Sequence, residues 1–264
     1  MQLSLCLEML YPDLSFTERM KTAAALGYRA FEFWDWRDKE LQAVNRTALE
    51  NSLAVAAMSG NRRYTLLDPD DHTGLLEEMM QVFAVAQRLH CHHVMMLTDV
   101  LNRDGSAAPT RPLPLETKIT SIVAGLRELA GWARDANITL LLEPLNTVLD
   151  HRGCFLDSSD LGVQILKQVN HPNVQLLYDI YHMSMMGEDV LTQLEKHRTH
   201  IGYVHVADMP GRHQPGTGTI DYAAVNSLLR RIGYSGFIGM EFSAAGEGKA
   251  ANESAAKAPL EVFA

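Results

Sequence analysis

Short apolar runs alternate with longer segments of helical periodicity from one end of this chain to the other. In the segment SFTERMKTAAALG, apolar residues recur at three- and four-residue spacing, as on one face of a helix. Ser15 and Glu18 are expected to form a capping box at its start, and Gly27 is expected to end it. Eight strands are expected between such segments, at residues 3–7, 30–34, 55–58, 93–97, 138–143, 174–178, 201–206 and 237–241.

Strands that alternate with helices are typical of a parallel sheet, and eight is the number that closes a barrel. A doubly wound open sheet is the alternative, but no GxGxxG motif follows the first strand. Apolar residues make up 47% of the chain, which is enough for a sizeable core, and no linker divides it. We therefore expect an α/β fold, a single-domain (β/α)8 TIM barrel over residues 1–264. Its longer loops, 59–71, 98–114 and 208–220, are expected on the catalytic side.

Composition argues against several classes of protein. The formal net charge of −9 disfavours nucleic-acid binding, because an acidic surface repels phosphate. The three cysteines (Cys6, Cys91 and Cys154) are widely spaced and fit a reducing compartment without disulfides. No apolar run approaches the length of a membrane span, and the N-terminus resembles a strand more than a signal peptide. A cytoplasmic protein without membrane contacts is expected.

Four consecutive expected strands end in a residue that can bind a metal ion. These residues are Glu143, Asp179, His205 and Glu241, at intervals of 36, 26 and 36 residues. A barrel brings the carboxyl ends of its strands together at one rim, where its active sites lie. Three carboxylates and one imidazole suit Mn²⁺ or Mg²⁺, and also Co²⁺ or Zn²⁺, more than a structural zinc site, which prefers thiolates. The pattern predicts one divalent ion at this rim.

Such a site can labilise a carbon acid. Four protein ligands leave two positions on an octahedral ion for an α-hydroxy carbonyl group, whose C–H then becomes more acidic. Glu143 and Glu241 come from strands three steps apart, so they form a workable base and acid around a metal-bound enediolate.

The segments LLLEPLN, YDIYHM, HVADMPGRHQPGTGTIDY and GMEF resemble the hydroxypyruvate isomerase family, as does the opening CLEMLYPDLSFTERMKTAAALGYRAFEFW. That family belongs to the xylose isomerase-like TIM barrels, together with ketose 3-epimerases and endonuclease IV. The resemblance implies that Glu143, Asp179 and Glu241 bind a divalent metal and that Glu143 and Glu241 transfer the proton. It places His205 as the remaining ligand and implies a homo-oligomer.

Substrate contacts are expected from three further residues. The resemblance implies that His182 contacts the substrate and that Arg212 binds a carboxylate or hydroxyl group. Trp34 follows the second strand, where it could stack on a sugar face. The loops FWDWRDKE, MSGNRRYTLLDPDDH and MMLTDVLNRDG depart from the family pattern, which leaves the substrate open and makes Arg62 and Arg63 further candidates.

The predicted function is a metal-dependent intramolecular oxidoreductase, an isomerase of the hydroxypyruvate type acting on a small hydroxy-carbonyl acid or sugar. A ketose 3-epimerase or a 2-oxo-tetronate-type isomerase could use the same site. An abasic-site endonuclease would need a trinuclear site and a basic face, and this chain supplies neither. A silent sugar-acid-binding protein is disfavoured because both glutamates are present.

Overall fold

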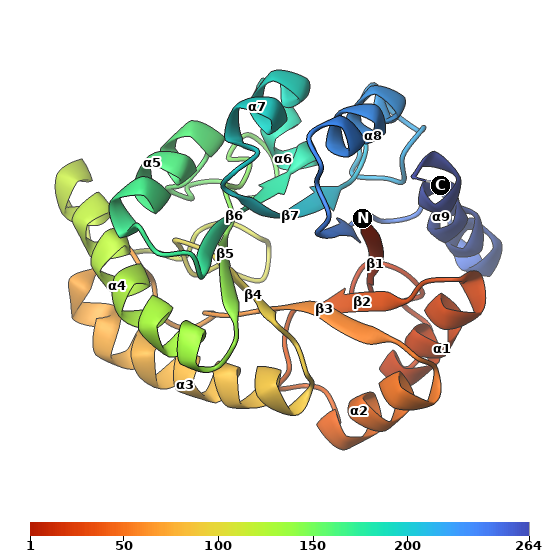
Figure 1. Ribbon diagram of the computed structural model, residues 1–264, viewed down its shortest axis with the longest axis horizontal. Coiled ribbons are helices and arrows are strands. Elements are labelled where there is room, and N and C mark those ends of the chain that lie inside the picture. Colours follow the sequence, from red (N-terminus) through yellow and green to blue (C-terminus); the bar gives the residue numbers. More distant parts are fainter. Residues whose placement is uncertain (264) are drawn as a thin grey trace.

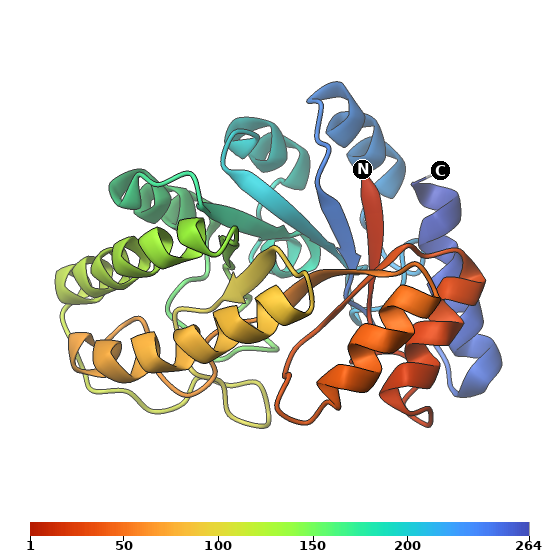
Figure 2. The same cartoon turned by 60° about the horizontal axis from the view of Figure 1, so that its bottom comes forward.

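A computed structural model describes residues 1–263, and in that range eight parallel strands close into a barrel in chain order. Helices surround the strands on the outside, as Figures 1 and 2 show. The strands are β1 (Gln2–Cys6), β2 (Ala30–Phe33), β3 (Ala54–Ser59), β4 (His93–Met96), β5 (Thr139–Leu142), β6 (Val174–Asp179), β7 (Ile201–Val206) and β8 (Phe237–Met240). The α-helices are α1 (Phe16–Leu26), α2 (Leu41–Glu50), α3 (His72–Arg88), α4 (Leu115–Asp135), α5 (Ser159–Val169), α6 (Ile180–Met185), α7 (Val190–His197), α8 (Tyr222–Arg231) and α9 (Gly248–Val262).

The predicted (β/α)8 barrel is confirmed, and every expected strand is present. Several strand ends differ by one residue from the prediction, because apolar periodicity does not mark where ladder hydrogen bonding stops. Glu143 and Glu241 each lie one residue beyond their strands, and Asp179 is the last residue of β6.

Local sequence signals act as expected at the first helix. Ser15 and Glu18 form the predicted capping box, so N–H groups that the helix leaves unpaired find acceptors. Gly27 ends the helix with φ of 106°, a conformation that costs other residues steric strain. The Ala-rich C-terminal segment forms α9, the last helix against the barrel.

The strands are buried on both faces, as in other parallel barrels. Leu140 and Leu142 of β5 belong to the layer between strands and helices, whereas Leu141 belongs to a separate cluster inside the barrel. Leu177 and Tyr203 join that inner cluster, with small residues such as Ala56. The barrel interior is therefore packed, and a ligand has room only at its ends.

Among residues 1–263, every helix is too short or too polar to cross a lipid bilayer.

Candidate metal centre and active site

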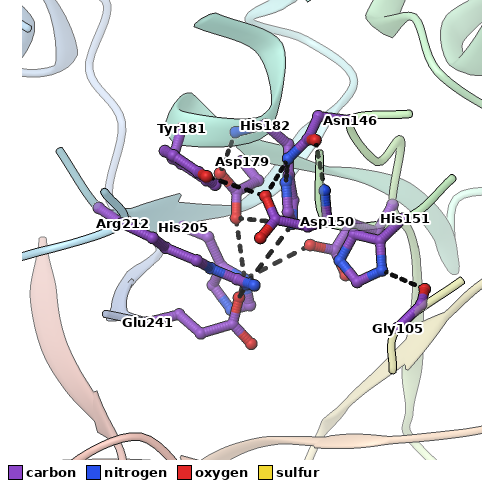
Figure 3. Close-up of polar contacts among 12 residues, drawn as sticks. Gly105, Asn146, Asp150, His151, Asp179, Tyr181, His182, His205, Arg212 and Glu241 are labelled. Atoms are coloured by element: carbon purple, nitrogen blue, oxygen red, sulfur yellow. Dashed lines mark hydrogen bonds and ion pairs between the residues drawn. The ribbon is translucent and has the colours of Figure 1, made fainter. Parts of the chain in front are cut away.

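Four side chains converge at the carboxyl ends of neighbouring strands. One ligand atom from each of Glu143, Asp179, His205 and Glu241 lies within 4.8 Å of the others, and all four residues are buried. Strand register explains the grouping, because Asp179 pairs with His205, and His205 pairs with Gly239. Figure 3 shows Asp179, His205 and Glu241 facing a common point.

The imidazole of His205 fits a metal ligand. Its Nδ1 atom lies 3.4 Å from Glu241, 3.6 Å from Glu143 and 3.8 Å from Asp179, and has no hydrogen-bond partner among residues 1–263. A buried nitrogen left unpaired beside three carboxylates is the arrangement that a cation would satisfy. The donor set and its geometry thus suit a divalent ion.

The opposite nitrogen of His205 faces a buried carboxylate. Nε2 lies 3.0 Å from Oε1 of Glu32, and Oε2 of Glu32 accepts a hydrogen bond from the Tyr203 hydroxyl group. A carboxylate behind a ligating histidine fixes the ring and raises its basicity. Gly239 makes room for this contact, because a Cβ there would lie 2.4 Å from Glu32 and 2.7 Å from His205. Glu32 is thus a buried carboxylate with two structural partners, His205 and Tyr203.

Burial and mutual charge give the four groups different pKa values. Burial raises the pKa of Glu143, and it raises the pKa of Asp179 to about 7. Burial also disfavours the charged forms of His205 and Glu241, but the neighbouring charges have the larger effect on the pKa of each group. Glu32 and Glu241 raise the pKa of His205 well above its usual value, and His205 and Arg212 hold the pKa of Glu241 well below its own. The cluster thus attracts positive charge strongly.

Both oxygens of Glu241 are held from outside the cluster. Nε1 of Trp34 donates to Oε1 at 2.8 Å, and Nη2 of Arg212 donates to Oε2 at 2.6 Å. The Arg212 side chain is only 16% exposed, so it is not a solvated loop charge. The predicted site residues Trp34 and Arg212 therefore lie beside the cluster, where each contacts Glu241 and lines the pocket.

His182 lies in a buried network that sequence patterns did not reveal. Its backbone N–H donates to Oδ1 of Asp179 at 2.8 Å, so Asp179 also caps α6. Its Nδ1 atom accepts from the Asn146 amide at 2.7 Å, and Asp150 accepts from both Asn146 and the Tyr181 hydroxyl group. In the sequence, only the presence of Asn146 in the segment LLLEPLN could have indicated this network.

A pocket of about 370 Å³ opens over this cluster. Its wall includes the expected Trp34, His182 and Arg212, and also Asp150 and His151, which were not predicted. Of the two candidate arginines, Arg62 lines the pocket, whereas Arg63 lies 3.4 Å from the buried Glu78 on α3. The 98–114 loop also lines the pocket, through Leu101, Asn102, Arg103, Asp104 and Gly105.

The PGTG segment acts through backbone amides. Gly216 N–H and Gly218 N–H donate to Oδ2 of Asp208, and Gly216 has a positive φ of 91°. Gly218 is required for space and not for a positive φ. A Cβ at Gly218 would lie 2.2 Å from the carbonyl oxygen of Met209.

Comparison with known proteins gives the family. The family model for the xylose isomerase-like TIM barrel matches residues 20–263. This chain belongs to the xylose isomerase-like TIM barrel family. The predicted family membership is confirmed.

Two curated relatives carry isomerase names. The 2-oxo-tetronate isomerase of Cupriavidus necator is 29% identical over 246 residues, covering 89% of this chain and 90% of that protein. The putative hydroxypyruvate isomerase of Drosophila melanogaster is 33% identical over 237 residues, covering 86% of each chain. These relatives confirm that the chain is an enzyme of the isomerase type.

One solved structure is titled AP endonuclease, family 2, from Brucella melitensis. It superposes with a TM-score of 0.86 over 96% of both chains at 24% identity, a likeness that extends to the fold alone.

Proposed function

We propose that this protein is a divalent-metal-dependent isomerase that interconverts the aldehyde and ketone forms of a small hydroxy-carbonyl acid or sugar. The proposal rests on the four-residue cluster beneath the pocket and on the isomerase names of its curated relatives. The relatives named hydroxypyruvate and 2-oxo-tetronate isomerases favour a sugar acid as the substrate.

Glu143, Asp179, His205 and Glu241 would hold the ion, and their oxygen-rich set favours Mn²⁺ or Mg²⁺ over Co²⁺ or Zn²⁺. When bound, such an ion polarises the substrate carbonyl group and acidifies the adjacent C–H bond. Glu32 would hold the ring of His205 from behind.

Glu143 and Glu241 supply the proton transfer. One carboxylate removes the proton from the hydroxyl-bearing carbon, and the other carboxyl group returns a proton to the neighbouring carbonyl carbon. The hydroxyl proton passes to the former carbonyl oxygen, so no atoms or electrons are gained or lost. The opposite pKa shifts of Glu143 and Glu241 suit a pair that divides acid and base functions.

The pocket wall provides the groups that would hold the rest of the substrate. Arg212 lines the pocket, and its guanidinium group carries N–H donors besides the one that Glu241 accepts, so it would also donate to a substrate oxygen. His182 is buried beside it, with its Nε2 atom 3.5 Å from Nη2 of Arg212. Trp34 anchors Glu241 and offers its ring to the pocket.

The single observation that carries the proposal is that Glu143 and Glu241 line the same pocket, with ligand atoms within 4.8 Å of one another. Glu143→Gln and Glu241→Gln should each lower turnover about 10²–10⁴-fold, as expected for loss of a general acid or base. Glu195→Gln on the surface serves as the control. Turnover is followed by NMR in D₂O with saturating Mn²⁺ and a panel of small sugar acids and ketoses, and metal binding is checked by calorimetry.

Normal turnover by metal-loaded Glu143→Gln and Glu241→Gln would remove the proposed proton transfer. Inversion at C3 without movement of the carbonyl group would show that the enzyme is a ketose 3-epimerase and not an aldehyde–ketone isomerase.

A further inference from the structure

His151 is held between two loops of the pocket wall. It lies on the loop between β5 and α5, and its Nδ1 atom is 2.9 Å from the carbonyl oxygen of Gly105 on the 98–114 loop. Figure 3 shows this contact at the edge of the cluster. A carbonyl oxygen can only accept, so Nδ1 carries the proton. In the neutral ring, Nε2 of His151 is therefore an acceptor.

The backbone is shaped for this contact. Gly105 has φ of 84°, and a Cβ there would lie 2.7 Å from the carbonyl oxygen of Asp150. Ala107 of the same loop donates its N–H to the carbonyl oxygen of Arg152 at 2.9 Å. Burial, followed by the nearby charge of Arg212, lowers the pKa of His151, which keeps the ring neutral.

His182 has the opposite tautomer, because the orientation of Asn146 is fixed by other partners. Oδ1 of Asn146 accepts from the backbone N–H groups of Leu149 and Asp150, and its Nδ2 donates to the Asp150 carboxylate. The amide therefore presents N–H to Nδ1 of His182 at 2.7 Å, and Nδ1 must accept. The proton of the neutral ring lies on Nε2, which becomes a donor.

The pocket thus contains one imidazole that accepts and one that donates. Their ring centroids are 5.0 Å apart with an interplanar angle of 71°, and both residues line the pocket. His182 lies against Asp179, with Nε2 and Oδ2 3.8 Å apart, whereas His151 makes no hydrogen bond or ion pair with the four cluster residues among residues 1–263. As a lining residue outside the cluster, His151 is available to a part of the substrate other than the reacting carbons.

We propose that His151 is a specificity-determining residue whose Nε2 atom accepts a hydrogen bond from an outer hydroxyl group of the substrate. The substrate class is then a sugar acid or sugar with at least one hydroxylated carbon beyond the isomerising pair, four carbons or longer. His182, which lies against Asp179, donates to a substrate oxygen nearer the cluster. The inference rests on the proposed function, because that function supplies the reaction that the substrate undergoes. The contact between His151 and a hydroxyl group can nevertheless be tested by binding alone.

The tautomers are tested first, on the wild-type protein loaded with diamagnetic Mg²⁺. Long-range ¹H–¹⁵N correlation spectra should show the Nδ1–H form for His151 and the Nε2–H form for His182. His92 and His93, whose Nδ1 atoms also face backbone carbonyl groups at 2.9 Å, are internal references for the Nδ1–H form. An Nε2–H or doubly protonated ring at His151 near neutral pH overturns the proposal.

Binding is tested by calorimetry with two ligands, threonate, which is a four-carbon aldonate, and its 4-deoxy analogue. This measurement does not require turnover. His151→Asn keeps an amide N–H near Gly105 but removes the acceptor that faces the pocket. It should weaken threonate binding about fivefold, the effect of one hydrogen bond, and leave the 4-deoxy analogue unchanged. His92→Asn is the matched control, since His92 has the same kind of carbonyl contact on the surface.

The proposal would be overturned if His151→Asn lost equal affinity for both ligands or lost none for either. It would also be overturned if the wild-type protein bound the two ligands equally well. Should His151→Asn not fold, the wild-type tautomer spectra and the wild-type preference for threonate still decide it. The wild-type protein could prefer threonate, and His151→Asn could abolish that preference, while no compound of the panel is isomerised. That result would support the subsite and contradict only the proposed reaction.

Discussion

Trp34 and Arg212 approach Glu241 from different parts of the barrel, and each takes one oxygen of its carboxylate. Trp34 follows β2, and Arg212 lies on the loop after β7 with φ of 55°. A carboxylate with both oxygens held cannot rotate freely, so the oxygen that we propose transfers the proton keeps its direction. At the scale of single residues, two donors outside the four-residue cluster therefore fix the orientation of Glu241.

Trp34→Phe keeps the ring in the pocket wall but removes the N–H group that donates to Glu241. We expect turnover to fall about tenfold, because hydrogen bonds to charged groups are worth roughly 1.5–3 kcal/mol. Manganese affinity should change less. Steady-state kinetics and calorimetry check this, with Trp132→Phe on α4 as the control, since Trp132 is 37% exposed. Unchanged turnover would show that the Trp34 contact does not orient Glu241.

At the scale of elements, helix α3 fastens two loops of the pocket wall. Glu78 on α3 is fully buried and accepts a hydrogen bond from Nη2 of Arg37 at 2.8 Å. Its carboxylate also accepts the backbone N–H groups of Arg62 and Arg63. One buried carboxylate thus ties the loop after β2 to the loop after β3.

Glu78→Gln should lower the free energy of unfolding by about 2 kcal/mol, because it removes the charge opposite Arg37 and replaces one acceptor oxygen by a donor. The Michaelis constant should rise more than turnover falls, since the loops carry Trp34 and Arg62 rather than the metal ligands. Urea denaturation and kinetics measure both. The neighbouring exposed residue gives the control Glu77→Gln, and equal effects of the two variants would contradict the anchoring function.

At the scale of the whole molecule, we expect metal binding and folding to be coupled, because the four proposed ligands come from β5 to β8 and the residues that follow them. These residues meet only when the barrel closes. A ligand that binds the folded state alone stabilises it by about 2.7 kcal/mol at a concentration of one hundred dissociation constants.

Chelator-stripped protein should therefore melt several degrees lower, and added Mn²⁺ should restore the melting temperature. Asp179→Asn should abolish most of this response. Asp189→Asn is a matched control, because both aspartates cap the helix that follows them and asparagine caps equally well. Scanning calorimetry gives the measurement. A response of equal size in both variants would show that Asp179 is not a ligand.

Sequence periodicity alone identified the barrel, since parallel strands buried on both faces and amphipathic helices leave separate patterns along the chain. It also placed Glu143, Asp179, His205 and Glu241 at one rim, because in a closed parallel sheet all strand ends of one kind meet there. Trp34, expected from its position after the second strand, and His182 and Arg212, implied by the family resemblance, also line the pocket.

The tertiary structure decided the rest. Contacts such as His151 with Gly105, or His205 with Glu32, join segments far apart in sequence and follow no periodic pattern. The tautomer of His182 depends on how the Asn146 amide is turned, which depends in turn on two backbone N–H groups. The sequence determined which chemical groups gather at the rim, whereas only the folded loops determined which atoms donate, which accept and how far the pocket extends.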